Sequence, residues 1–143
     1  MAGQIHFEDI NEGDTIPELV KKPTTQQLVH WAAGSGDFYQ VHYDKDFAIG
    51  TGLEGVIVHG ALKHAFLGEL LWNFAAPGGR VRRVACSYRG MDVPDKTFKL
   101  QGRVTKKYQK DGENFVEMEV WGENDAGQKT TPGTGVVTLP SKA

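Results

Sequence analysis

The feature that most constrains the fold is a long apolar segment, residues 61–76, that comes directly before a run of strand-like segments. Its apolar residues recur at helical spacing and spread over most of the helix circumference. We therefore predict a helix over 61–76 that is buried on nearly all sides. The sequence Pro77-Gly78-Gly79 ends this helix, because neither proline nor glycine continues one readily.

The chain after this helix reads as strands joined by tight turns. The predicted strands cover residues 81–89, 97–108, 114–122 and 129–139. Turn-forming residues such as Asp111-Gly112 separate them at hairpin spacing. In the third strand Val116, Met118 and Val120 alternate with polar residues, as in a sheet with one buried face. One apolar helix followed by about four antiparallel strands predicts an α+β hot-dog fold, in which the sheet curls around a central helix.

The first part of the chain is predicted to hold an extended piece, a helix and a long loop. Residues 15–22 read as an extended edge segment. Thr24 begins a capping box with Gln27, and the helix that follows should end at Gly34 and Gly36. Residues 37–55 show no clear period, apart from a candidate helical turn at 44–49. Long loops inside compact domains are often functional.

Composition narrows the class of protein. The chain of 143 residues has 16 Lys+Arg against 18 Asp+Glu, so its charge gives no reason to expect nucleic acid or an anionic membrane as a partner. The single cysteine, Cys86, cannot form an internal disulfide, which favours a reducing compartment and excludes a Cys-based zinc site. The N-terminus lacks a signal-peptide pattern, and the segment 61–76 is too short for a bilayer span. We expect one soluble, cytoplasmic domain over residues 1–143.

An acid and an imidazole form the first motif that composition does not explain. Asp37 and His42 lie five residues apart in the loop that follows the first predicted helix. Five is not a helical repeat, so the two side chains meet only if the loop curls back, which Gly34 and Gly36 make inexpensive. An Asp beside a His orients the imidazole and keeps one tautomer. On the pair alone, the stronger interpretation is that Asp37 caps a turn and His42 is an ordinary loop histidine.

The second motif is an apolar run, residues 56–62, that reaches His59-Gly60 and enters the apolar helix. A glycine in the first helical turn lets a ligand approach the backbone closely. Its free N–H lies at the positive end of the helix dipole, where it suits a carbonyl oxygen that gains negative charge. A plain strand-to-helix turn is the alternative. Combined with Asp37 and His42, this motif supplies the groups that addition of water to an enoyl thioester needs.

The two motifs and the interval between them resemble the signature of MaoC-like (R)-specific enoyl-CoA hydratases, on residues 35–44, 47–48 and 56–62. The resemblance implies a hot-dog fold, usually dimeric, and hydration of trans-2-enoyl thioesters to (R)-3-hydroxyacyl thioesters, or the reverse dehydration. It makes Asp37 and His42 the catalytic pair and Gly60 the carbonyl-polarising amide.

The same resemblance places Tyr39, Val58 and His59 at the substrate and implies no cofactor, with CoA or an acyl carrier protein entering as part of the substrate. We expect a homodimer, because a lone sheet of this size leaves an edge open. The chain departs from the family at Tyr39-Gln40, where Asn-Pro is common, and at Gly68, where a serine is common. Tyr39 is bulkier than Asn, which bears on substrate preference.

Other functions compete with hydration. A hot-dog thioesterase would direct water at the thioester carbonyl, and a non-catalytic hot-dog subunit would support an active partner. A zinc site is disfavoured, because His59 and His64 lie five residues apart with no Cys or Glu at ligand spacing. We instead expect His59 to pack under the motif loop and His64 to face outward or toward a partner subunit. Four arginines suit CoA phosphates or an acidic carrier protein, although a solvated strand face explains each one more simply. They are Arg80, Arg82, Arg83 and Arg89.

Overall fold

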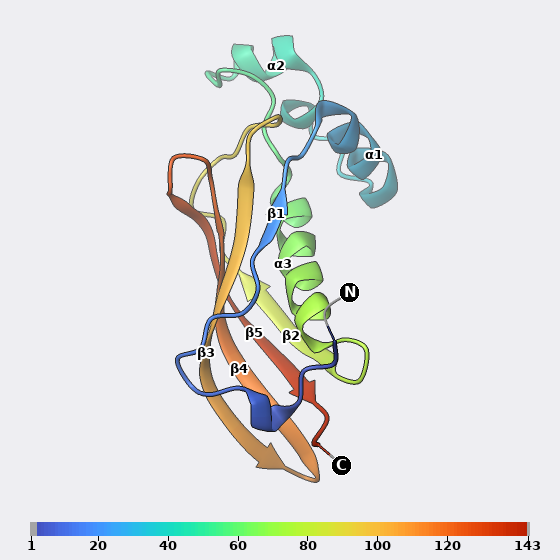
Figure 1. Ribbon diagram of the computed structural model, residues 1–143. Helices are drawn as coiled ribbons and strands as arrows, with labels where there is room; N and C mark the ends of the chain where they lie inside the picture. The colour runs from blue at the N-terminus through green and yellow to red at the C-terminus, as the bar shows by residue number, and fades with distance from the viewer. Residues whose placement is uncertain (1–2, 143) are drawn as a thin grey trace.

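The computed structural model describes residues 3–142 and shows a curled antiparallel sheet packed against one long helix (Figure 1). The strands are β1 (Leu19–Lys21), β2 (Arg80–Cys86), β3 (Phe98–Lys110), β4 (Glu113–Glu123) and β5 (Lys129–Leu139). The α-helices are α1 (Thr25–Ser35), α2 (Lys45–Gly50) and α3 (Gly60–Ala75), and two short 3-10 turns are η1 (Phe7–Asp9) and η2 (Gln40–His42). This arrangement confirms the predicted α+β hot-dog fold.

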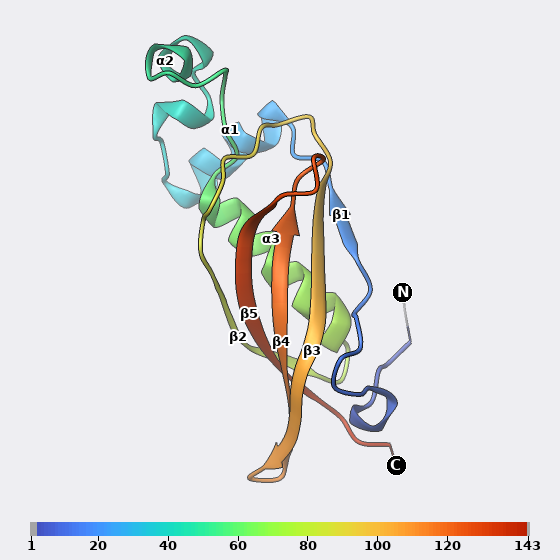
Figure 2. The ribbon, with the colours of Figure 1, turned by 90° about the vertical axis from the view of Figure 1, so that its left-hand side faces the viewer.

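The sheet has the strand order β1-β3-β4-β5-β2, and all of its pairs are antiparallel. Asp111 and Gly112, both with positive φ, form the tight turn between β3 and β4. Val116, Met118 and Val120 are all buried on the face of β4 that looks toward α3. In Figure 2 the three long strands run side by side across α3. The sheet thus has the buried inner face that the alternation predicted.

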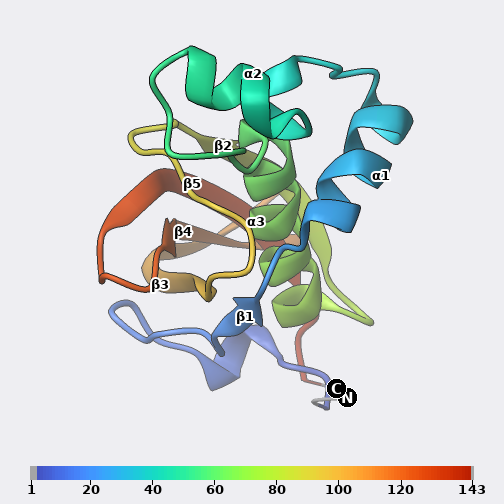
Figure 3. The ribbon, with the colours of Figure 1, turned by 90° about the horizontal axis from the view of Figure 1, so that it is seen from above.

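Helix α3 supplies much of the core, and one side of it is open. Leu67 and Leu71 have no exposed surface, whereas the Trp72 side chain is 58% exposed. Ala61 and Asn73 are exposed as well. The prediction that this helix is buried on nearly all sides is wrong for the single chain, because the sheet curls over only one side of the helix (Figure 3).

The shorter helices lie near the N-terminal end of α3 (Figures 1 and 3). The Thr24 hydroxyl accepts a hydrogen bond from the Gln27 N–H at 3.1 Å, and Gly36, with a φ of 77°, ends α1 as predicted. Asp44 caps α2 by accepting from the Phe47 N–H at 3.0 Å. Within residues 3–142, each helix is too short or too polar to cross a membrane. The caps at Gly36 and Asp44 fix the two ends of the loop that carries Asp37 and His42.

Candidate active site

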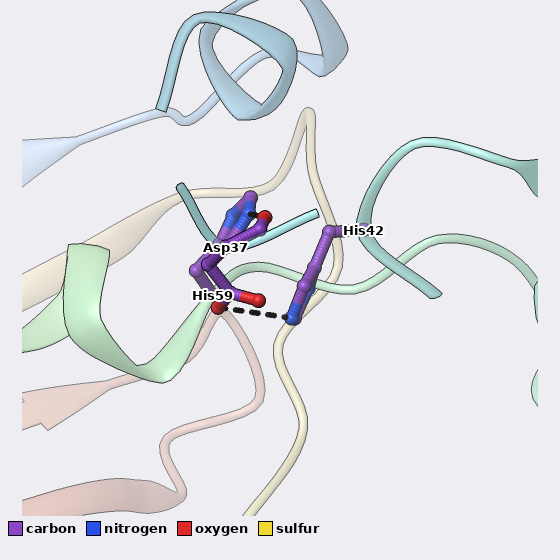
Figure 4. Close-up of side chains that lie close together, drawn as sticks. All are labelled: Asp37, His42 and His59. Atoms are coloured by element: carbon purple, nitrogen blue, oxygen red, sulfur yellow. Dashed lines mark hydrogen bonds and ion pairs between the residues drawn. The ribbon is translucent and has the colours of Figure 1, made fainter. Parts of the chain in front are cut away.

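The loop between α1 and α2 curls back and brings the predicted pair together. The Asp37 Oδ2 and His42 Nε2 atoms lie 3.8 Å apart, as Figure 4 shows. Asp37 also caps the local turn, because its Oδ1 accepts from the Tyr39 N–H at 3.4 Å. The turn-capping interpretation and the pairing are therefore both present in one residue. Asp37 is partly exposed, whereas the His42 side chain is almost wholly buried.

A backbone carbonyl sets the tautomer of His42. The Nδ1 atom lies 2.8 Å from the Ile57 carbonyl oxygen, which only accepts hydrogen bonds, so Nδ1 carries the ring proton. Nε2 is then unprotonated in the neutral ring and faces Asp37. At 3.8 Å the two atoms are too far apart for a direct hydrogen bond. A water molecule placed beside both atoms would be within hydrogen-bond reach of each.

His59 lies directly beneath His42. The two rings stack with centroids 3.8 Å apart and an interplanar angle of 20°. The His59 Nε2–H donates to the Asp37 carbonyl oxygen at 3.3 Å, and the side chain has no exposed surface. Burial, and then the neighbouring His42, lower the pKa of His59. In this position the His59 ring supports the Asp37–His42 pair from inside the protein. The ring could contact a substrate only if it moved.

The side chains of Asp37, His42 and His59 meet the distance requirement for a metal site, with ligand atoms within 4.8 Å of one another. Their orientation does not suit one. The in-plane lone pairs of two nearly parallel rings run side by side and do not converge on one ion, whereas a structural zinc needs ligands at tetrahedral angles. The ring of His64 lies outside this group of side chains, and its Nε2 is 3.3 Å from the Val84 carbonyl oxygen. The residues present do not fit a metal centre.

Gly60 is the first residue of α3, so no carbonyl of the helix itself can accept its N–H. A Cβ at this position would lie 2.8 Å from a ring carbon of Tyr88. The position therefore requires glycine for as long as the Tyr88 ring stays in place. The amide that the sequence singled out is at the positive end of a 16-residue helix, where negative charge is stabilised.

The remaining predicted residues lie at different depths. Tyr39 is 56% exposed and makes edge-on contacts with the rings of His42 and Phe47 at 6.2 and 6.1 Å. It therefore forms a rim of the site. Val58 is 4% exposed and belongs to the hydrophobic core, so its side chain packs inside the protein in this structure. All four arginines are exposed, and Arg82 is engaged with Glu113 and the Phe115 ring on the sheet.

Sequence reasoning missed a buried polar cluster next to Gly60. Lys63, in the first turns of α3, is 2% exposed and pairs with Asp92 at 2.7 Å. The available signal was a lysine that interrupts the most apolar segment of the chain. Sequence alone did not identify Asp92 as its partner, because the contact joins residues 29 positions apart.

A half-open sheet curled on one helix, with an acid and an imidazole near the helix N-terminus, defines a hot-dog domain with a candidate acid–base site. The chain belongs to the MaoC-like family: the family model described as "MaoC like domain" matches residues 11–125. The family resemblance of the two motifs is therefore confirmed.

Known proteins with related sequences or structures are consistent with this placement. The fatty acid synthase subunit beta of Saccharomyces cerevisiae is 30% identical over 123 residues, which are 82% of this chain. The chain spans only 5–6% of the length of the curated relatives it matches. The unliganded R-hydratase of Pseudomonas aeruginosa superposes with a TM-score of 0.87 at 23% identity, covering 97% of this chain and 88% of that one. The (R)-hydratase of A. caviae involved in PHA biosynthesis gives 0.83 at 23%, covering 93% and 99%. At such identities the structural likeness establishes the fold.

Proposed function

We propose that this domain is a hydro-lyase that adds water to trans-2-enoyl thioesters, giving (R)-3-hydroxyacyl thioesters, or catalyses the reverse dehydration. The observation that carries the proposal is the 3.8 Å separation of Asp37 Oδ2 and His42 Nε2, with the His42 tautomer fixed by Ile57. Membership of the MaoC-like family supports the reaction class. The (R) stereochemistry and the CoA or carrier-protein thioester come from the family resemblance of the motifs.

In this mechanism one water binds between Asp37 and His42, and its oxygen attacks Cβ of the enoyl group. His42 Nε2, unprotonated in the assigned tautomer, accepts a proton from the water as the new C–O bond forms. The π electrons of the Cα–Cβ bond form a new π bond between Cα and the carbonyl carbon, and those of the C=O bond move to the thioester oxygen, where the Gly60 N–H stabilises the enolate. A proton held by the pair then passes to Cα on the same face. No other reactant is consumed.

A panel of trans-2-enoyl-CoA substrates from short to long and branched chains tests the reaction. The expected result is loss of the ultraviolet absorbance of the enoyl thioester, with an (R)-3-hydroxyacyl product and no free thiol. Release of free CoA from saturated acyl-CoA would instead identify a thioesterase. If no substrate in the panel reacts, the domain is not a self-sufficient hydratase, and the non-catalytic subunit becomes the better interpretation.

The open face of α3 supports a homodimer as the working assembly. Trp72 is 58% exposed on that helix, and β2 lies at an edge of the sheet with one side unpaired in the single chain. A second copy would cover the apolar face and extend the sheet past β2. Sedimentation of the purified chain should therefore give a dimer at micromolar concentration. A monomer there would refute this part of the proposal.

A further inference from the structure

A buried lysine occupies the least favourable end of α3. Lys63 is on the first turn after Gly60, where the helix dipole disfavours a cation, and its side chain is 3% exposed. Lysine is almost never fully buried unless it is paired. A charge at this position therefore needs specific partners, and the chain provides them from two distant segments.

The partners form a buried polar cluster around one oxygen of Asp92. The Lys63 Nζ donates to Asp92 Oδ2 at 2.7 Å and to the Gly90 carbonyl oxygen at 3.0 Å. The Thr130 hydroxyl donates to the same Asp92 oxygen at 2.7 Å. Asp92 is 7% exposed and Thr130 is 5% exposed. Because the charges are shielded from water and each bond is directional, the cluster fixes where the 88–92 segment lies on α3.

The same segment contacts the turn around Gly60 on both sides. Before Gly60, the Val58 N–H donates to the Asp92 carbonyl oxygen at 2.8 Å. At Gly60, the Tyr88 ring lies so close that a Cβ would be 2.8 Å from it. After Gly60, the Lys63 Nζ lies 5.9 Å from the centroid of that ring. Residues 58–63 are therefore held at three points by one loop.

We propose that Lys63 and Asp92 are a positioning pair that holds the Gly60 N–H, and Tyr88 against it, in the geometry needed to stabilise the enolate oxygen. The inference rests on the proposed function, in which Gly60 is the donor. Stability alone does not account for the pair, because apolar residues of similar volume often replace a buried ion pair without loss. Apolar residues would fill the same space but would not supply the directional hydrogen bonds that tie the 88–92 segment to α3.

That difference gives the test. The triple variant Lys63→Met/Asp92→Leu/Thr130→Val replaces the cluster by apolar side chains and leaves no buried charge unpaired. The matched control is Lys21→Met/Glu69→Leu, which removes another ion pair of α3, with Nζ and Oε1 2.6 Å apart, nine residues beyond Gly60. We expect the triple variant to fold and its kcat for enoyl-CoA to fall roughly 10–100-fold with KM within about twofold of wild type. The control should keep both constants.

A triple variant whose kcat stays within about twofold of wild type would overturn the inference. Amide hydrogen exchange at Val58 gives a second readout that needs no substrate, because this N–H bonds directly to the Asp92 carbonyl. Its exchange should be at least about tenfold faster in the triple variant and unchanged in the control. Unchanged exchange at Val58 also refutes the proposal.

The two proposals fail in different ways. A wild-type protein that hydrates no enoyl thioester refutes the proposed function, and the exchange at Val58 still decides whether the pair positions the turn. If the triple variant does not fold, the isosteric Asp92→Asn variant, which keeps the shape of the side chain and an oxygen that can accept hydrogen bonds, replaces it in both measurements, with the same expected directions and the same refuting results.

Discussion

Replacing His59 by phenylalanine should flatten the pH dependence of stability below about pH 6.5. The His59 ring has no exposed surface and stacks on His42 at 3.8 Å. Its Nδ1 has no hydrogen-bond partner within residues 3–142. Burial, followed by the neighbouring His42, lowers the pKa of His59, so the folded protein resists protonation there.

The sign of the effect follows from proton linkage. In the unfolded chain a histidine takes up a proton near pH 6.5. Because the folded pKa of His59 is lower, the unfolded state binds more protons as the pH falls below that value, and the free energy of unfolding decreases. One proton gives a slope of at most about 1.4 kcal/mol per pH unit. Below the folded pKa of His59 the slope returns to zero and the accumulated loss of stability stays constant. Above about pH 6.5 this histidine causes no loss.

Guanidinium unfolding of the wild type and of His59→Phe at several pH values from about 7.5 to 5 measures this slope. Phenylalanine keeps a flat ring under His42 but removes the titrating nitrogens. The wild type should lose stability toward acid more steeply than the variant, and the difference between the two curves should open below about pH 6.5. Parallel curves over the whole range would show that His59 does not resist protonation and would refute the reasoning.

Three further changes have distinct expected results. Lys63→Met alone should lower the free energy of unfolding by about 3–5 kcal/mol, measured by guanidinium unfolding, because it leaves the Asp92 carboxylate buried without its cation. Gly60→Ala should displace the half-exposed Tyr88 ring and lower kcat roughly tenfold or more, while stability changes by less than about 1.5 kcal/mol. Thr24→Ala should cost about 1 kcal/mol of unfolding free energy through loss of the α1 cap and leave kcat unchanged. An unaltered kcat in Gly60→Ala, or an altered one in Thr24→Ala, would contradict the assigned roles.

Local sequence patterns predicted most of the helices and strands. The last strand has the predicted bounds, Lys129–Leu139, and the central helix begins and ends within one residue of its prediction. These segments are long and strongly periodic, and turn residues such as Asp111-Gly112 mark their ends. The strand predicted at 81–89 ends at Cys86, because the chain then leaves the regular ladder to reach over α3, although the Arg89 N–H still bonds to the Thr130 carbonyl.

Contacts between distant segments were beyond sequence reasoning. The family resemblance of the motifs, and not the five-residue spacing alone, paired Asp37 with His42. His59 was expected to pack under the motif loop, but its stacking on the His42 ring was not predicted. The partner of Lys63 comes from a loop with no period of its own. The exposed side of α3 was also missed, because an apolar stripe shows that a surface needs covering and does not show which chain covers it.

The hydration rate of the Asp37→Asn variant tests the central claim most directly. Asparagine keeps the shape of the side chain and removes its charge and its capacity to carry a proton, and Asp46→Asn, at an exposed position in α2, is the matched control. With the best enoyl-CoA of the panel, we expect kcat to fall roughly 10²–10⁴-fold in Asp37→Asn and to stay at the wild-type value in Asp46→Asn. Near wild-type hydration by Asp37→Asn would contradict the acid–base role of the Asp37–His42 pair.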